Sequence, residues 1–131
     1  MSNNIYLEKD LPTEMIIGDR SYEIMDFQRD NKKPKLRTII KQAKKMGAHL
    51  SKDDIDHLLD HQGDIPVALQ NKVKFIFIDW KKSKLPCDIG CVFWLDYRWT
   101  YYWYNYNHII DGKLMVYNHE IYGKPKVLHR K

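Results

Sequence analysis

Two histidines one helical turn apart are the residues whose types and spacing best fit metal chemistry. His57 and His61 would lie on one side of a helix, where two imidazoles can share a divalent cation. Cys87 and Cys91 form a C-x₃-C pair that would complete a tetrahedral zinc set. Aspartates at the third and fourth positions before His57 favour its protonated form, which works against metal ligation. We expect a solvated helix edge with no bound metal or cofactor, and a zinc site shared by the four residues is the alternative.

A hydrolase could also assemble its site from carboxylates and histidines that are scattered along the chain. The candidates for such a site, most plausibly that of a metal-dependent nuclease, are Asp79, Asp96, His108, His119 and Glu120. The chain has no G-x-S-x-G nucleophile motif and no glycine pattern of a phosphate or dinucleotide loop. A hydrolase is therefore the alternative to a protein that only binds, and a self-associating structural protein is a third possibility.

The segment from Phe93 to His108 carries nine aromatic residues in sixteen positions. Up to Trp103 the odd positions are apolar, and this period of two predicts a single strand whose odd face, with Trp99 and Trp103, is buried. From Tyr104 onward the aromatic residues move to the even positions. A bulge or strong twist near residues 100–104 would explain the change of face.

Asp111-Gly112 lies between apolar pairs and predicts a two-residue hairpin turn of type I′. The expected cross-strand pairs are Tyr102 with Ile121, Tyr104 with His119, Tyr106 with Tyr117 and His108 with Met115. This face carries four tyrosines and two histidines. Because tyrosine combines an apolar ring with a hydroxyl, the face is either a half-buried side of the sheet or a contact surface.

The positive charge is concentrated in residues 28–46, which precede an acidic segment over residues 51–64. Between Gln28 and Met46 there are eight basic residues and one acidic residue, and the whole chain has a formal net charge of +5, which favours an anionic partner. Aromatic rings flanked by cations are typical of proteins that bind single-stranded nucleic acid. The predicted binding residues are Arg37, Lys41, Lys44 and Lys45 on a helix, and Trp94, Arg98, Tyr102, Tyr104, Tyr106, Tyr117 and His119 on the aromatic hairpin. We therefore predict a non-enzymatic protein that binds nucleic acid or an acidic protein surface.

These residues would be positioned by a small α+β domain. Apolar periodicity predicts a hairpin over residues 14–27, helices over about 35–46 and 51–62, and a buried strand over 73–80. This order predicts a mainly antiparallel sheet of about five to six strands with the two helices packed on one face. We expect residues 1–131 to form a single domain, with 124–131 as a loose basic tail.

The hydrophobic fraction of 44% and the charged fraction of 30% are those of a globular domain rather than a disordered chain. No apolar run reaches the ~20 residues that cross a bilayer, and the start MSNNIYLEKD lacks the regions of a signal peptide. Two closely spaced cysteines do not suggest a secreted disulfide framework. We expect a cytoplasmic protein with no membrane partner and with homo-oligomer formation as an open possibility.

Overall fold

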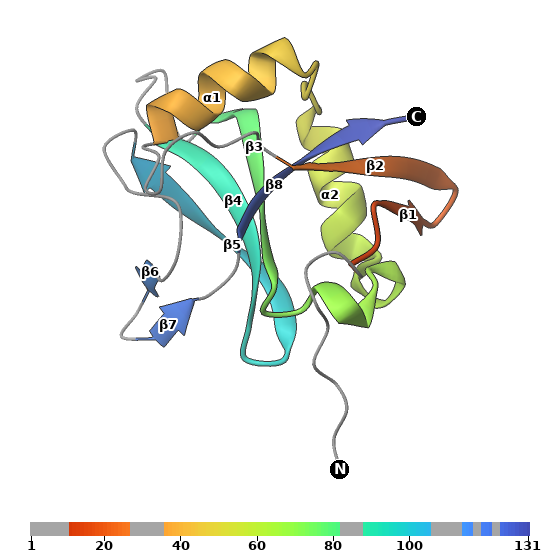
Figure 1. Ribbon diagram of the computed structural model, residues 1–131. Helices are drawn as coiled ribbons and strands as arrows, with labels where there is room; N and C mark the ends of the chain where they lie inside the picture. Colours follow the sequence, from red (N-terminus) through yellow and green to blue (C-terminus); the bar gives the residue numbers. More distant parts are fainter. Residues whose placement is uncertain (1–10, 27–35, 82–87, 106–113, 117–118, 122–123) are drawn as a thin grey trace.

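The main sheet combines strands from both ends of the chain. The computed structural model describes residues 11–26, 36–81, 88–105, 114–116, 119–121 and 124–131. Six strands pair in the order β1-β2-β8-β3-β4-β5 (Figure 1). Their bounds are β1 Glu14–Ile17, β2 Arg20–Asp26, β3 Val73–Lys81, β4 Asp88–Leu95, β5 Arg98–Asn105 and β8 Lys124–Arg130. Only the β3–β8 pair among these strands is parallel, so the sheet is mixed but mainly antiparallel.

The two helices lie where the apolar periodicity predicts them. Helix α1 spans Leu36–Lys45 and helix α2 spans Lys52–Asp60. Two 3₁₀ turns follow α2, η2 at Gln62–Asp64 and η3 at Val67–Leu69, and a separate two-stranded sheet contains β6 (Leu114–Val116) and β7 (His119–Ile121). The predicted class, a small α+β domain with a sheet of five to six strands and two helices, is confirmed. Within the described ranges, no helix has the length and apolar character needed to cross a bilayer.

The helices pack on opposite faces of the sheet. The first core includes side chains from α1 and from alternate strand positions, among them Ile39, Ala43, Ile76, Ile78, Cys91, Phe93 and Val127. The second core includes side chains from α2 and from the intervening positions, among them Ile55, Leu58, Phe75, Phe77, Val92, Trp99 and Leu128. The prediction that both helices pack on one face is therefore wrong. Residues 75–78 of β3 form a continuous apolar run because this strand is buried on both faces. Each face must therefore be covered by other elements.

The C-terminal residues form a central strand and not the predicted loose tail. Strand β8 lies between β2 and β3, and its four residues from Pro125 to Leu128 are all buried. The ammonium of Lys126 lies 3.1 Å from a carboxylate oxygen of Asp26 on β2. The segment begins and ends with basic residues, so the sequence pattern did not indicate that its middle forms a buried strand. Neighbouring strands, which the local sequence does not reveal, supply the pairing that orders it.

A turn at Asp96 and Tyr97 divides the aromatic segment into two strands. Both residues have left-handed backbone, with φ values of 53° and 65°, as a two-residue type I′ hairpin requires. Trp94 therefore pairs with Trp99, and odd positions of β4 share a face with even positions of β5. The prediction of one continuous strand with a single buried odd face is wrong, because it placed no turn at a dipeptide without glycine.

The expected pairing of the aromatic residues is also wrong where the structure describes it. Tyr102 pairs with Cys91 and Tyr104 with Ile89, whereas His119 pairs with Val116 in the small sheet. The register of β4 and β5 is continuous, so the bulge expected near residues 100–104 is absent from this pair. The register shift lies instead in β3, between Phe77 and Lys81. The expected turn at 111–112 lies outside the described residues.

Burial distinguishes the two tryptophans that were expected to be equally buried. Trp99 is 1% exposed, whereas Trp103 is half-buried. Replacing Trp99 by alanine is expected to lower the free energy of unfolding by roughly 3–5 kcal/mol, and Trp103→Ala by clearly less. Denaturant midpoints of the two variants measure the difference, with Tyr101→Ala as a half-exposed control. Equal losses for both tryptophans would contradict this assignment of the core.

Candidate functional site

Three partly exposed aromatic rings form one group on the α2 side of the sheet, hereafter the aromatic surface. The ring centroid of Trp80 lies 4.8 Å from that of Trp103 and 5.2 Å from that of Tyr101, and the latter two are 6.1 Å apart. Tyr101 is 50% exposed, while Trp80 packs its buried side against the second core. These rings give the protein an accessible apolar area beside the outer strand β5.

The position of Trp80 depends on the bulge in β3 and on a glycine in the next strand. The register of β3 shifts just after Phe77, which pairs with Gly90 of β4. A Cβ atom at Gly90 would overlap the indole ring of Trp80. Because glycine leaves this space open, the indole lies across β4 and contacts the rings of β5. Bulge and glycine together thus assemble the aromatic surface from strands that are not adjacent.

Helix α1 presents a second surface, the lysine face, made of Lys41, Lys44 and Lys45. All three side chains are exposed, because the apolar residues of the same helix, such as Ile39 and Ala43, point into the first core. Within the described residues, no carboxylate forms an ion pair with these three lysines. The lysine face is therefore a local excess of positive charge on the side of the sheet opposite to the aromatic surface.

The binding residues predicted from sequence do not form one continuous surface. Trp94 is half-buried in the second core, 5.8 Å from Trp99 in an edge-to-face arrangement, and Arg98 is exposed beside the hairpin turn. Tyr102 packs on the first core, on the face covered by α1. The predicted surface is thus divided between two faces of the sheet.

The side chains of five predicted binding residues lie outside the described part of the structure. Arg37 lies in α1, Tyr104 in β5 and His119 in β7, but their side chains fall outside the description. Tyr106 and Tyr117 lie outside the described residues.

Sequence reasoning missed Trp80 and Tyr101 as surface residues. Trp80 was assigned to a buried strand, and Tyr101 to the inward face of the supposed single strand. One signal was available in the sequence. Gly90 stands inside a strand pattern, and an isolated strand glycine often marks the close approach of another group.

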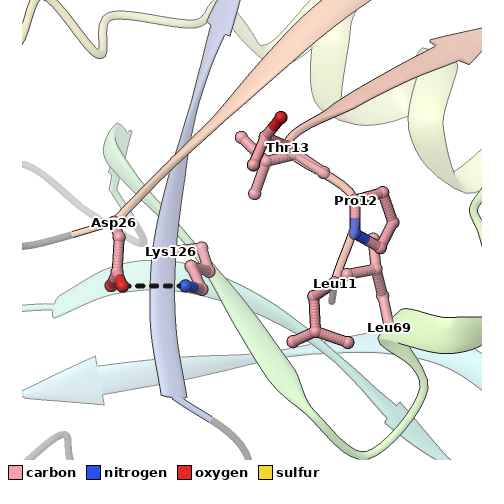
Figure 2. Close-up of a pocket in the computed structure, with 7 residues that line it drawn as sticks. Leu11, Pro12, Thr13, Asp26, Leu69 and Lys126 are labelled. Carbon is pink, nitrogen blue, oxygen red and sulfur yellow. Dashed lines mark ion pairs between the residues drawn. The ribbon is translucent and has the colours of Figure 1, made fainter. Parts of the chain in front are cut away.

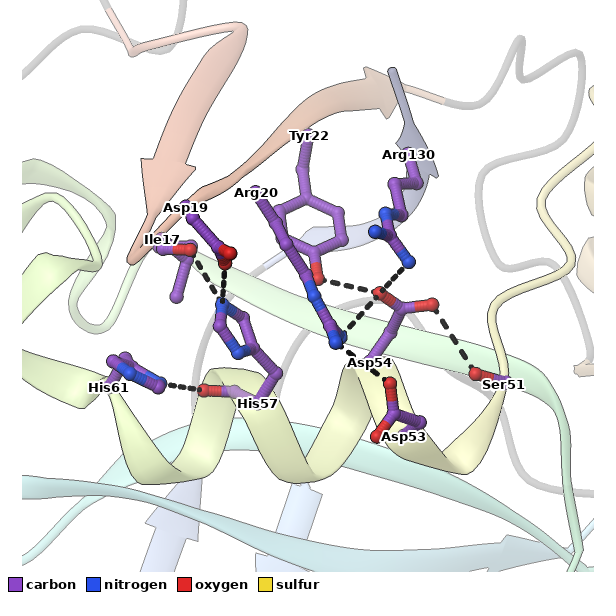
Figure 3. A network of polar contacts seen from close by, with 10 residues as sticks. All are labelled: Ile17, Asp19, Arg20, Tyr22, Ser51, Asp53, Asp54, His57, His61 and Arg130. Carbon is purple, nitrogen blue, oxygen red and sulfur yellow. Dashed lines mark hydrogen bonds and ion pairs between the residues drawn. The ribbon is translucent and has the colours of Figure 1, made fainter.

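A buried carboxylate joins α2 to the N- and C-terminal strands (Figure 3). Asp54 is 4% exposed, and its Oδ1 accepts a hydrogen bond of 2.8 Å from the Tyr22 hydroxyl. The same oxygen lies 3.2 Å from a guanidinium nitrogen of Arg20 and 3.5 Å from one of Arg130. Arg20 also pairs with Asp53 at 2.9 Å. The carboxylate charge is therefore compensated, which accounts for its burial as part of the fold.

The network changes the acidity of its tyrosine. Burial, and secondly the hydrogen bond to Asp54, raise the pKa of Tyr22 from its ordinary value of 10.0 to about 12. The neutral hydroxyl is the donor that the carboxylate needs, so the two groups stabilise each other in these protonation states. Contact with the Tyr22 hydroxyl, followed by Asp53, raises the pKa of the Arg20 guanidinium.

His57 of α2 and His61, which follows the helix, serve the fold in the same region. The Nε2–H of His57 donates to the carbonyl oxygen of Ile17 at 2.6 Å, and the Nδ1–H of His61 donates to the His57 carbonyl at 2.8 Å (Figure 3). Cys91 is buried in the first core, on the opposite face from α2, and Cys87 lies outside the described residues. Across the part of the chain that is described, no three His, Cys, Asp or Glu side chains are grouped so that they could hold a metal ion.

Of the residues suggested for a nuclease, the two aspartates lie far apart. Asp79 pairs with His49 at 2.8 Å, near the end of β3 that adjoins the start of β4. Asp96 lies in the turn at the other end of β4. His119 and Glu120 belong to β7 in the small sheet, and His108 lies outside the described residues. The two aspartates therefore cannot act on one substrate atom.

A cavity of about 600 Å³ lies between the start of the described chain and the β2–β8 pair (Figure 2). It is lined by Leu11, Pro12, Thr13, Ile24, Asp26, Leu69 and Lys126. The lining is largely apolar, with the Asp26–Lys126 ion pair at one side. The cavity volume lies within the range of small-molecule sites. The charges of Asp26 and Lys126 compensate each other, so the lining does not indicate a class of ligand.

Gly90→Ala is expected to disrupt the aromatic surface. The added methyl group must displace the Trp80 ring, at a cost of roughly 1–3 kcal/mol in unfolding free energy and with a change in the near-ultraviolet circular dichroism of the coupled rings. In a Trp80→Ala background the same substitution should cost much less, because no ring then occupies the space. A cost that is unchanged in that background would show that Gly90 is needed for another reason.

Tyr22→Phe tests the network through pH. The raised pKa means that the tyrosine contributes stability below pH 10, and that this contribution is lost as the pH rises through about 12. We expect the variant to be less stable by roughly 1.5–3 kcal/mol at neutral pH, since a hydrogen bond to a charged group is lost. The difference should narrow between pH 10 and pH 12 in denaturant titrations. Tyr97→Phe, at a residue 92% exposed, is the control with little expected effect, and a difference for Tyr22 that stays constant with pH would contradict the assignment.

Comparison with known proteins provides no relative from which a role could be transferred. No protein-family model, curated protein or solved structure matches this chain. A role for the protein must therefore be inferred from the lysine face and the aromatic surface themselves.

Proposed function

We propose that this protein is a non-enzymatic binding protein that engages an anionic macromolecule through the lysine face of α1, with nucleic acid as the favoured class. The observation that carries the proposal is the exposure of Lys41, Lys44 and Lys45 without a carboxylate partner among the described residues. Three such charges on one helix face neutralise phosphates at little desolvation cost, since they are already hydrated.

The lysines of α1 differ from most of the aspartates of α2 in having no ion-pair partner among the described residues, and this difference supports α1 as the binding surface. Three of the four acidic residues of α2 are used locally, because Asp53 and Asp54 pair with Arg20 while Asp56 pairs with Lys52. They do not offset the charge of α1 through ion pairs. The formal net charge of +5 adds a long-range attraction for a polyanion.

The rigidity of α1 also favours a binding role. Its apolar side is anchored in the first core by Ile39, Ile40 and Ala43. The lysines therefore project from a fixed backbone, and binding does not require the helix to fold. The aromatic surface lies on the other face of the sheet, so it is not part of this footprint, although its rings offer a place for unpaired bases to stack.

The proposal includes the cytoplasmic location expected from cysteine usage. Cys91 is buried in the first core, and two closely spaced cysteines do not indicate the disulfide framework of a secreted protein. The hydrolase alternative is less well supported, because two of its proposed residues, Asp79 and Asp96, lie at opposite ends of β4.

The double variant Lys41→Gln/Lys45→Gln tests the footprint. If both lysines contact phosphates, affinity falls for all sequences, and the slope of log K against log salt becomes shallower by about 1.8 on duplex DNA or ~1.4 on single strands. Fluorescence anisotropy with labelled single-stranded and duplex oligonucleotides over a series of salt concentrations gives these slopes.

The matched control is Lys72→Gln/Lys124→Gln, which lowers the net charge equally. These lysines meet where β3 and β8 begin, since the Lys124 backbone N–H donates to the Lys72 carbonyl at 3.0 Å, away from α1 (Figure 1). The control should retain the wild-type slope. Equal slopes in wild type and the α1 variant would remove α1 as the footprint. Binding to polyglutamate without binding to oligonucleotides would replace nucleic acid by an acidic protein surface.

A further inference from the structure

Among the described residues, side-chain hydrogen bonds cap the edge of the outer strand β5 at one position, Trp99. Within the described residues, β4 is the only strand that pairs with β5. The side-chain amide of Gln62, at the start of η2, binds the backbone of Trp99 as a neighbouring strand would. Its Oε1 accepts from the Trp99 N–H at 2.8 Å, and its Nε2 donates to the Trp99 carbonyl at 2.8 Å.

These two bonds fix which backbone groups of β5 point away from β4. In an antiparallel pair, residues alternate between bonding the partner strand and directing N–H and C=O outward. Trp99 directs both groups outward, to Gln62. The register with β4 is continuous to Asn105, so the backbone groups of Tyr101, Trp103 and Asn105 point outward as well. Beyond the cap, three residues therefore offer strand-pairing groups.

We propose that a second copy of this chain pairs with β5 in an antiparallel, two-fold symmetric arrangement centred on Trp103. This register joins Trp103 to its symmetry mate and Tyr101 to Asn105 of the other copy, so that all three outward-facing residues pair. Gln62 lies beside Trp99, which is outside the run from Tyr101 to Asn105 that pairs in this register. The five residues from Tyr101 to Asn105 thus form a symmetric pairing unit beyond the cap.

The composition of the edge favours a second copy over a chain of another kind. The run from Trp99 to Asn105 contains no charged residue and no proline, the two devices that most often protect an edge strand from self-pairing. Pairing therefore brings no like charges together at the seam, despite the net charge of +5 on each copy. An acidic segment would find no cation within this run to pair with.

The same arrangement would bury further surface of aromatic side chains on the α2 side of the sheet. Tyr101 is 50% exposed and Trp103 is half-buried in the isolated chain. The proposed register places the two Trp103 residues beside each other, so that the aromatic surfaces of both copies become continuous. The small β6–β7 sheet does not pair with β5 and approaches β4 instead.

Analytical ultracentrifugation of wild type over roughly 1 µM to 1 mM tests the proposal, with a rise to twice the monomer mass as the expected result. Tyr101→Pro should weaken self-association at least about tenfold, because each of the two symmetry-related copies loses an outward N–H donor. Proline is tolerated there because this N–H does not bond β4. Tyr101→Thr removes the ring but keeps the donor, and should weaken the dimer less than proline does.

Asn105→Pro provides a second test, because the Asn105 N–H also points away from β4 and is one of the proposed pairing groups. Circular dichroism and the denaturant midpoint establish that each variant is folded. A wild-type protein that stays monomeric throughout the concentration range would overturn the proposal, and so would equal weakening by Tyr101→Thr and Tyr101→Pro in folded variants. None of these readouts depends on nucleic acid, so the dimer and the proposed function succeed or fail separately.

Discussion

Burial of β3 on both faces is the constraint on which the rest of the structure depends. Phe75 and Phe77 enter one core, and Ile76 and Ile78 enter the other. A strand of this kind must have neighbours on both edges and cover on both faces, since each exposed apolar side chain would forfeit roughly 1.5–3 kcal/mol of burial. Strands β4 and β8 supply the edges, while α1 and α2 supply the faces.

This constraint also explains why the ends of the chain are joined to α2. The β1–β2 hairpin and β8 extend the sheet beyond β3, and the buried carboxylate of Asp54 holds them through Tyr22, Arg20 and Arg130. The bond from His57 to the Ile17 carbonyl adds a further attachment at the hairpin. Charged and polar residues of α2 that resembled a metal site thus connect elements far apart in sequence. Their pairing leaves the lysine face of α1 as a conspicuous excess of charge.

The two sides of the sheet consequently differ in chemistry. One side carries α1 with its hydrated cations, and the other carries the aromatic surface beside the open part of β5. Binding of a polyanion would depend on the positive charge of α1. Pairing with a second copy of the chain would depend on the backbone groups of β5 and on the aromatic rings beside it. The two proposed interactions therefore use different surfaces and do not compete.

Local sequence determined the elements whose signal lies within a single segment. The helices near 36–45 and 52–60, the first hairpin and the buried strand β3 follow from apolar periodicity, and the exposure of Lys41, Lys44 and Lys45 follows from the apolar stripe of the same helix. The side of the sheet that each helix covers, the role of β8 and the partners of β5 were decided only by tertiary structure. These features depend on pairing between distant residues, and on a turn at Asp96 and Tyr97 whose left-handed backbone carries no glycine to reveal it. Trp80 joins the aromatic surface for the same reason, because the space above Gly90 exists only once β3 and β4 are paired.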